Sequence, residues 1–258
     1  MARLQTILDT IVETKKTEVI VARHQPVSFT RPAHPVPTFR SAISRSGIQI
    51  IAEIKKASPS RGILIEDFHP AELAKAYQAG GAAAFSVLTD ETYFKGHLTH
   101  LHDVAQLGLA PAIRKDFIID PVQIEQAYQA GASAILLIAA ILDDPALHSL
   151  YKIATNLRLD VLVEVHTVDE LKRVLHLDNP IIGVNNRNLH SFHVDLQTAL
   201  DMAPLIPAEL IKVTESGIFT RKDMLRMEDA GFHAALIGES LVTSGHPQQK
   251  LRELLGQD

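Results

Sequence analysis

Eight short apolar runs recur along the chain from residue 48 onward, each followed by a polar turn and a segment of helical periodicity. The runs are IQIIAEI (48–54), AAFSVL (83–88), LAPAIR (109–114), SAILLI (133–138), DVLVEV (160–165), PIIGV (180–184), LIKVT (210–214) and AALIG (234–238). Their starts lie 20 to 35 residues apart, which leaves room for the helical crossovers that parallel strands require. Runs that are apolar on both faces are typical of strands covered on both sides.

Eight β–α units in a chain of 258 residues predict an α/β fold, a closed (β/α)8 TIM barrel. An open doubly wound sheet is the alternative, but the sequence lacks its G-x-G-x-x-G signature. We expect one TIM-barrel domain over residues 1–258, with the barrel at 48–258 and an N-terminal helical extension at 1–47. Within the extension we expect an amphipathic helix at 2–22, a Pro-rich connector from Pro26 to Pro37 and a short helix at PTFRSAIS. This extension would plug the bottom of the barrel or extend its rim.

Composition excludes several classes of protein. Lys and Arg number 25 against 30 Asp and Glu, so a polybasic nucleic-acid partner site is not expected. There is no cysteine, which excludes disulfides, cysteine zinc sites and thiol nucleophiles. The longest apolar run, Ala134 to Leu142, has nine residues, against the roughly 18 that span a bilayer. The N-terminus lacks the features of a signal peptide, so we expect a cytoplasmic protein without a membrane partner.

Charged residues stand where the predicted strands end, and in a barrel the active site lies at those C-terminal ends. Because side chains alternate faces, Glu53 and Lys55 continue the row of Ile51, Lys115 that of Ile113 and Glu164 that of Leu162. Buried charges are costly unless they are paired, so we expect Glu53, Lys55, Lys115 and Glu164 to neutralise one another. Such a cluster suits proton transfer.

The seventh run supplies a check on this alternation. Ile211, Val213 and Glu215 share one face. If that face points inward, Lys212 should lie against the helices.

Glycine loops after the last two runs predict a phosphate site. Ser216-Gly217 and Gly238-Glu239 resemble the paired loops that hold a phosphate in many barrels. Glycine lets backbone N–H groups approach the anion, and a short helix after Gly238 would add a favourable dipole. We therefore expect a phosphorylated small-molecule substrate.

Three histidines have the spacing of metal ligands. His97, His100 and His102 fall on a predicted surface helix without a suitable carboxylate partner. We predict no metal site there.

Eight segments together resemble the indole-3-glycerol phosphate synthase family, and they follow the family's order. They are IIAEIKKASPSRG (50–62), SVLTDETYFKG (86–96), RKDFIID (114–120), LLIAAIL (136–142), LVEVHT (162–167), IIGVNNRNL (181–189), TESGI (214–218) and LIGES (236–240). The combination of EIKKASPS, RKDF and GVNNRNL is highly specific to that family. The N-terminal region also resembles the family's extra helical segment.

The resemblance implies a carboxy-lyase of tryptophan biosynthesis that needs no metal or organic cofactor. It would convert 1-(2-carboxyphenylamino)-1-deoxyribulose 5-phosphate to indole-3-glycerol phosphate with loss of carbon dioxide and water. Lys115 would be the general acid, made more acidic by Lys55, and Glu164 the general base. Lys55 would bind the substrate carboxylate or donate a proton when the hydroxyl leaves, and the assignment of each lysine to a step stays open. Glu53 would hold the lysines and the substrate in place.

The resemblance also implies the remaining contacts. Asn185, Arg187 and Glu215 would contact the sugar and the reacting atoms of the substrate. Ser58 would lie at the rim of the site. Apolar contacts to the aromatic ring would come from Phe117, Leu136 and Leu236. The phosphate would accept backbone N–H groups from Ser216, Gly217, Gly238 and Glu239, with the Glu239 side chain pointing away.

Other functions stay open at this point. Phosphoribosylanthranilate isomerase is a neighbouring barrel family, but its chemistry uses a cysteine–aspartate pair and this chain has no cysteine. A Schiff-base aldolase would use Lys115 as nucleophile. In a non-catalytic barrel the same charges, including Arg187 and the Glu53–Lys55 pair, would be structural ion pairs. Only 20 residues follow Gly238, so we expect no fused isomerase domain, and we expect a monomer.

Overall fold

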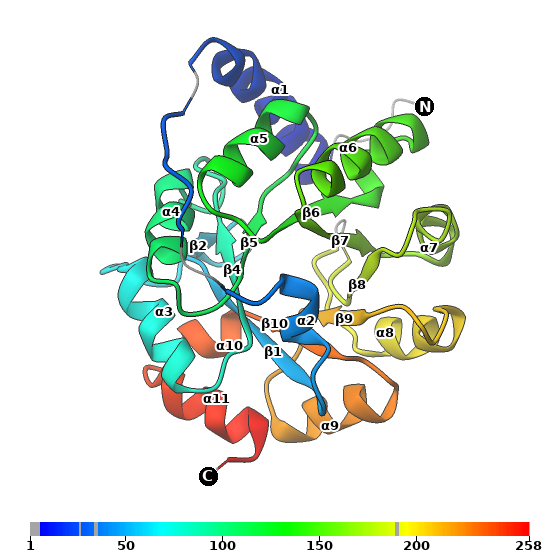
Figure 1. Ribbon diagram of the computed structural model, residues 1–258. Coiled ribbons are helices and arrows are strands. Elements are labelled where there is room, and N and C mark those ends of the chain that lie inside the picture. Colours follow the sequence, from blue (N-terminus) through cyan, green and yellow to red (C-terminus); the bar gives the residue numbers. More distant parts are fainter. Residues whose placement is uncertain (1–5, 26, 34–35, 189–190, 258) are drawn as a thin grey trace.

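The computed structural model describes residues 6–25, 27–33, 36–188 and 191–257, and at its centre lies a closed barrel of parallel strands (Figure 1). The barrel order is β1, β10, β9, β8, β7, β6, β5 and β4, and pairing of β4 with β1 closes it. These strands are β1 (Gln49–Ile54), β4 (Ala84–Leu88), β5 (Ala112–Lys115), β6 (Ala134–Ile138), β7 (Asp160–Val165), β8 (Ile181–Asn185), β9 (Lys212–Glu215) and β10 (Ala234–Ile237). The predicted TIM barrel is confirmed.

Each predicted run overlaps one barrel strand, and the differences lie at the ends: β5, β8 and β9 each extend one residue beyond the predicted run. The run LAPAIR begins at Leu109, whereas β5 begins at Ala112. Pro111 has no N–H to donate to a neighbouring strand, although its carbonyl accepts the N–H of Phe85. A small hairpin of β2 (Ala57–Ser58) and β3 (Gly62–Ile63) was not predicted, because two-residue strands leave no periodicity to detect.

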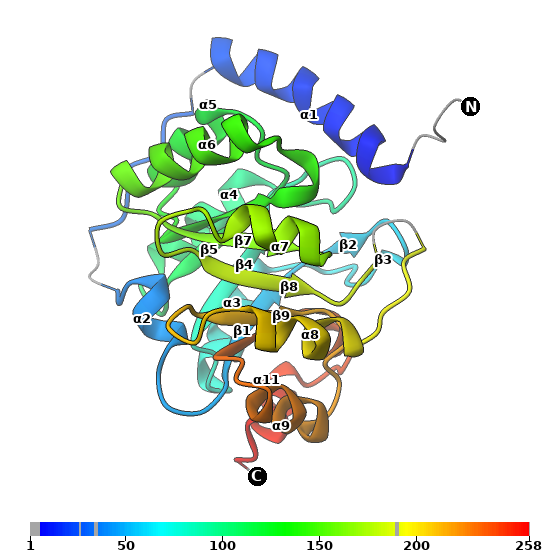
Figure 2. The same ribbon diagram turned by 90° about the vertical axis from the view of Figure 1, so that its right-hand side faces the viewer.

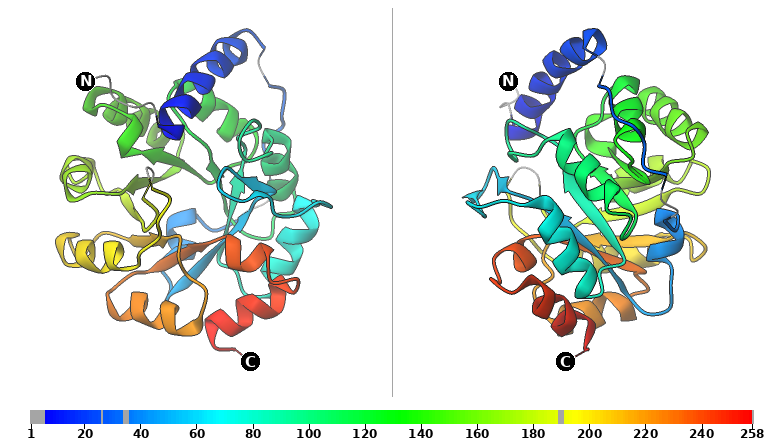
Figure 3. Two further views of the ribbon diagram at one scale, coloured as in Figure 1. Left: turned by 180° about the vertical axis from the view of Figure 1, so that it is seen from behind. Right: turned by 60° about the vertical axis from the view of Figure 1, so that its left-hand side comes forward.

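Helices surround the barrel in the views from both ends (Figures 1 and 3). They are α3 (Pro70–Ala79), α4 (Leu98–Gln106), α5 (Pro121–Gln129), α6 (Asp144–Asn156), α7 (Val168–Val174), α8 (Gln197–Met202), α9 (Arg221–Asp229), α10 (Glu239–Val242) and α11 (Pro247–Leu255), with short 3₁₀ turns η1 (Ala139–Ile141) and η2 (Ala203–Leu205). Local sequence sets their starts. Before α5, for example, the Asp120 side chain accepts the Val122 N–H, Gln123 completes a capping box, and Pro121 opens the first turn. Among the described residues, no helix is both long and apolar enough to cross a membrane.

Two apolar clusters follow from strand alternation. Ile51, Ile113 and Val213 pack inside the barrel, whereas Ile50 and Ile182 pack with the helices outside it. Lys212 is on the outer face, where its Nζ donates to the Ala203 carbonyl of η2 at 3.0 Å. The expected orientation of Lys212 is therefore correct, and the row that ends at Glu215 faces inward.

The N-terminal extension covers both ends of the barrel. Helix α2 (Phe39–Ile43) packs Phe39 and Ile43 against the interior cluster at the bottom. Helix α1 (Ile7–His24) lies beside α5, and its first turn reaches the strand tops, at the opposite end from α2 (Figure 2). One segment therefore plugs the bottom and the other extends the rim. Residues 2–5 of the predicted first helix lie outside the described residues.

Candidate active site

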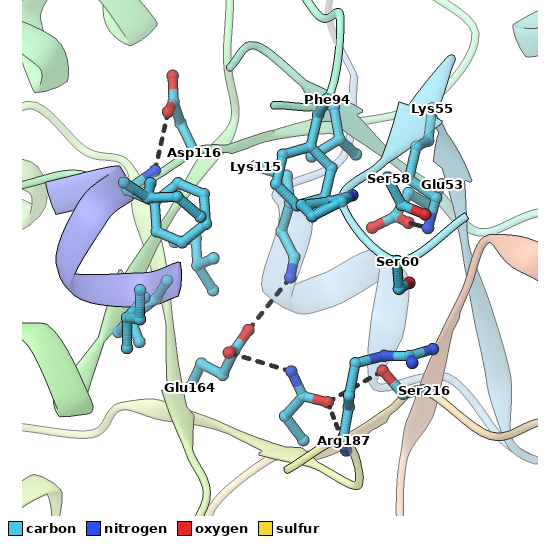
Figure 4. Close-up of a pocket in the computed structure, with 18 of the residues that line it drawn as sticks. Glu53, Lys55, Ser58, Ser60, Phe94, Lys115, Asp116, Glu164, Arg187 and Ser216 are labelled. Atoms are coloured by element: carbon cyan, nitrogen blue, oxygen red, sulfur yellow. Dashed lines mark hydrogen bonds and ion pairs between the residues drawn. The ribbon is translucent and has the colours of Figure 1, made fainter. Parts of the chain in front are cut away.

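A pocket opens at the C-terminal ends of the barrel strands, beneath the first turn of α1 (Figure 4). Charged and polar side chains from β1, β5, β7 and the loops after β8 and β9 converge on it. Its lining contains Glu53, Lys55, Ser58, Ser60, Phe94, Lys115, Phe117, Leu136, Ile138, Glu164, Asn185, Arg187, Phe192, Ser216 and Glu239, with Ile7, Leu8 and Ile11 from α1. The pocket thus joins a charged side to an apolar side.

Lys115 is the centre of the charged side. Its Nζ donates to Glu164 Oε2 at 3.1 Å and to Glu215 Oε2 at 3.0 Å. On β1 the Lys55 ammonium donates to Glu53 Oε1 at 2.6 Å. The structure therefore brings Lys55, Lys115, Glu53 and Glu164 into one pocket, and Glu215 lines a smaller cavity that adjoins it.

The electrostatics of Lys115 correct one expectation. Burial alone would lower the pKa of Lys115, but the carboxylates around it, Glu164 and Glu215 foremost, outweigh burial and raise the pKa well above its ordinary value. The expectation that Lys55 makes Lys115 more acidic is wrong, because the nearby carboxylates act more strongly than the second lysine. Lys115 is therefore a firmly protonated ammonium.

Glu164 and Glu215 respond differently to the same lysine. Burial would raise the pKa of Glu164, but Lys115 and then His166 outweigh it, so the pKa of Glu164 is lowered. For Glu215, burial and the nearby Glu164 dominate over Lys115 and raise the pKa. Two carboxyl groups with opposite shifts around one ammonium form an arrangement suited to acid–base chemistry.

Glycines make room for two of the buried carboxylates. A Cβ at Gly183 on β8 would lie 2.4 Å from Glu215 Oε1 and 3.1 Å from Leu162 Cδ1. A Cβ at Gly238 after β10 would lie 2.4 Å from Glu53 Oε1. The two glutamates fit inside the barrel because their carboxylates occupy the space that a Cβ at these glycines would fill.

We expect Gly183→Ala to displace the Glu215 carboxylate from Lys115, since the added methyl group occupies its place. Overpacking of this kind costs about 1–3 kcal/mol of unfolding free energy. Misplacement of a group in the site should lower kcat by about tenfold. Steady-state kinetics and urea unfolding measure both effects. In the double variant Gly183→Ala/Glu215→Asp the shorter acid should recover the lost unfolding free energy, and no recovery would contradict this steric explanation.

Asn185 connects the base of the pocket to the neighbouring loop. Its Nδ2 donates to Glu164 Oε1 at 3.1 Å, and its Oδ1 accepts from the Ser216 hydroxyl at 2.9 Å and the Arg187 N–H at 3.0 Å. Ser216 has a left-handed φ of 66°, which is uncommon outside glycine. Asn186 Nδ2 donates to the backbone carbonyls of Glu215 and Ser216, and these two hydrogen bonds stabilise the left-handed turn at Ser216.

The two glycine loops border a second, smaller cavity that adjoins the pocket, with Lys55, Lys115, Arg187 and Leu236 also in its lining. Gly217 has a φ of 85°, and a Cβ there would lie 2.8 Å from Val194 Cγ1. Gly238 caps α10, whose first N–H groups lack helical acceptors. Backbone N–H groups of the two loops are thus available to an anion in this cavity, together with the cationic side chains in its lining.

Two side chains of these loops lie elsewhere than expected. The Glu239 carboxylate does not point away, because it pairs with Arg61 and lies 3.5 Å from Arg187 at the edge of the pocket. Leu236 lines the smaller cavity rather than the apolar side of the main pocket, where Phe117 and Leu136 lie.

A buried lysine fixes α1 to the strand tops. Lys15 is 1% exposed, and its Nζ lies 2.7 Å from Asp90 Oδ2 and 3.0 Å from Asp116 Oδ1. Burial would lower the pKa of Lys15, but the two aspartates outweigh it and the pKa is raised. Asp116 directly follows Lys115 in the chain. The ion pair of Lys15 with Asp116 therefore connects α1 to the end of β5, where Lys115 lies.

The sequence interpretation missed several lining residues. Ile7, Leu8 and Ile11 come from α1, and an amphipathic pattern alone cannot say which end of the barrel a helix covers. Phe94 and Phe192 come from loops, where periodicity gives no signal.

His166 was also missed, although it lies only two residues after Glu164, directly beyond the end of β7. That spacing was the signal that could have found it.

The three histidines with metal-ligand spacing pack separately. His97 Nδ1 accepts the Thr99 N–H, the His100 ring lies edge-on to Phe68, and the His102 ring stacks on Phe29. Within the described part of the chain, no group of three or more His, Cys, Asp and Glu is arranged to hold a metal ion.

Comparison with known proteins finds matches over nearly the whole chain. A family model described as indole-3-glycerol phosphate synthase matches residues 8–254. A protein of Leptothrix cholodnii named indole-3-glycerol phosphate synthase is 44% identical over 97% of this chain and 99% of its own length.

Solved structures of other enzymes share the fold. A 3-hexulose-6-phosphate synthase has a TM-score of 0.64 at 14% identity, covering 81% of this chain and 99% of its own. A mutant tryptophan synthase alpha-subunit of Pyrococcus furiosus has a TM-score of 0.61 at 13% identity, covering 81% of this chain and 98% of its own. At these identities the likeness concerns the fold alone.

Proposed function

The chain belongs to the indole-3-glycerol phosphate synthase family, and from that premise we propose how its side chains close the indole ring. The family's reaction is a decarboxylating lyase reaction on a phosphorylated small molecule. One observation carries the proposal: Lys115 lies between Glu164 and Glu215 in a pocket with an apolar side and an adjoining cavity bordered by glycine loops. We take 1-(2-carboxyphenylamino)-1-deoxyribulose 5-phosphate as the substrate.

Ring closure requires the aryl carbon to attack the ribulose carbonyl while the carbonyl oxygen gains a proton. Lys115 supplies that proton. Its raised pKa means that the ammonium is fully protonated before substrate arrives, and the developing alkoxide is basic enough to take the proton. Loss of carbon dioxide then restores the aromatic ring.

The second half of the reaction removes water. Glu164 accepts the proton whose loss lets the pyrrole ring form, since its lowered pKa keeps it an ionised carboxylate. Lys55 binds the substrate carboxylate and protonates the departing hydroxyl. Glu53 holds Lys55 through their 2.6 Å hydrogen bond, and Asn185 orients Glu164 at 3.1 Å.

Substrate orientation follows the two cavities. Phe117 and Leu136 contact the aromatic ring, as do Leu8 and Phe94, and Ser58 contacts it from the rim. The backbone N–H groups of Ser216, Gly217, Gly238 and Glu239 bind the phosphate. Arg187, now paired with Glu239, and Glu215 contact the sugar. Leu236 lies beside the phosphate rather than the ring.

A Schiff-base aldolase is disfavoured by the same electrostatics. Forming a Schiff base requires a neutral lysine amine, and the carboxylates around Lys115 hold it in the charged form. The isomerase alternative still lacks the cysteine its chemistry uses.

The direct test mixes the purified protein with the carboxyphenylamino sugar phosphate and follows the appearance of indole fluorescence. We expect turnover that persists in the presence of a metal chelator. Absence of turnover with this substrate, from protein that is folded by circular dichroism, would contradict the proposal. Two finer predictions accompany it, a monomer and a cytoplasmic location, which size-exclusion chromatography and cell fractionation test.

A further inference from the structure

His166 follows β7 directly and stands behind the Glu164 carboxylate rather than in the substrate pocket. Its side chain is 10% exposed. The residue lines a separate groove beside α1, together with Leu8, Glu170 and Arg187. His166 is therefore placed to act on Glu164 without contacting the substrate.

Two carboxylates face the two ring nitrogens. Nε2 lies 3.2 Å from Glu164 Oε1 on β7, and Nδ1 lies 3.5 Å from Glu170 Oε2 in the first turn of α7. Glu170 also accepts the backbone N–H of His166 at 2.7 Å, which joins the end of β7 to the first turn of α7. The imidazole thus sits between an acid of the site and an acid outside it.

The other charges around the groove come from α1 and from the loop after β8. Arg187 is the cation on the loop, and α1 contributes Asp9, Glu13 and Lys16. Lys16 and Glu13 pair with each other at 2.7 Å. The carboxylates of Glu164 and Glu170 are the charged groups within 4 Å of the ring nitrogens in the described residues.

Burial alone would lower the pKa of His166, but Glu164 and Glu170 outweigh it and raise the pKa to about 9. His166 is therefore an imidazolium at neutral pH. Glu164 consequently lies between two cations, Lys115 on the pocket side and His166 on the groove side.

We propose that His166, held between Glu164 and Glu170, is a positioning residue that keeps the Glu164 carboxylate ionised and aimed at the substrate. The inference rests on the proposed function, because it assigns His166 to the base of that reaction. His166 acts through Glu164, and Glu170 acts through His166.

The proposal has a consequence for pH dependence. A group with a raised pKa carries its proton below that pKa and loses it as pH rises through it. Above about pH 9, the imidazolium becomes neutral, and Glu164 loses one of its two cations. Turnover should then fall to a plateau rather than to zero, since Lys115 still holds Glu164.

The test compares His166→Gln, Glu170→Gln and the control His148→Gln, an exposed histidine on α6, by measuring kcat and KM from pH 5.5 to 10.5. In His166→Gln we expect kcat at pH 8 to fall about tenfold, a part of what general base catalysis supplies, with KM changed less than about threefold. The alkaline fall should vanish, because the imidazolium whose deprotonation causes it is absent. In Glu170→Gln the alkaline fall should move to lower pH by about one unit, because the imidazolium has lost one carboxylate.

An unchanged alkaline limb in His166→Gln, with Glu164→Gln inactive, would overturn this proposal and leave the proposed function standing. An active Glu164→Gln would instead overturn the role of Glu164 on which both rest. If His166→Gln does not fold, an unmoved alkaline limb in Glu170→Gln overturns the inference. An NMR titration of the wild-type ring should show a midpoint near 9, and a midpoint near the ordinary value of about 6.5 would also overturn it.

Discussion

Lys115→Ala is expected to lower kcat by at least about a hundredfold, the usual scale for a general acid. The variant removes the proton donor at the ribulose carbonyl and leaves Glu164 and Glu215 facing each other without their shared ammonium. Two buried carboxyl groups in this position should share a proton, which also weakens Glu164 as a base. Single-turnover kinetics with indole fluorescence measure the chemical step directly.

Lys212→Ala is the matched control for this prediction. Lys212 is another buried lysine at a barrel strand, but its Nζ donates to a carbonyl of η2 on the outer face. It should lose stability while keeping turnover within a few-fold of wild type. Glu164→Gln, which retains the shape of the base and removes its charge, should lose about as much turnover as Lys115→Ala, at least about a hundredfold. Near-native turnover in either site variant would refute the assigned roles.

The sequence was sufficient to predict the barrel and its charged rows for a simple physical reason. Strand alternation is a local property of the backbone. The side chains of Glu53 and Lys55 are therefore expected on the same inward face as Ile51, independently of the rest of the chain. The barrel topology then brings every inward row to the same end, and Lys115 and Glu164 meet there. Neither step needs knowledge of loops.

Properties that depend on several segments at once could not be predicted. The charge state of Lys115 is set by carboxylates from three other strands, and the expected effect of Lys55 was wrong for that reason. The direction of Glu239 depends on Arg61 and Arg187, which lie in two separate loops.

The end of the barrel that α1 covers is a similar case. It is determined by the pairing of Lys15 with the aspartates after β4 and β5. The sequence alone does not show that Lys15 is buried and that its neighbour Lys16 is exposed.

The difference in burial between Lys15 and Lys16 underlies the largest change in unfolding free energy that we expect. Lys15→Met should lower the free energy of unfolding by about 3–5 kcal/mol, because it removes the cation that the buried carboxylates of Asp90 and Asp116 share and leaves Asp116 with Arg114 alone. Lys16→Met is the control, since Lys16 is 59% exposed and pairs with Glu13 at the surface. Its effect should stay within about 0.5 kcal/mol. Urea unfolding at pH 7 measures both.

The same network fixes how the effect varies with pH. Burial would raise the pKa of Asp116, but Arg114 and Lys15 outweigh it, so the pKa is lowered. The stability from this carboxylate is therefore present above its unfolded pKa of about 3.9 and is lost as pH falls further. The difference between wild type and Lys15→Met should shrink below that pH. Because α1 carries Leu8 and Ile11 into the pocket, the variant should also raise KM more than it lowers kcat. A Lys15→Met protein as stable as Lys16→Met would show that the buried lysine does not hold α1 on the barrel.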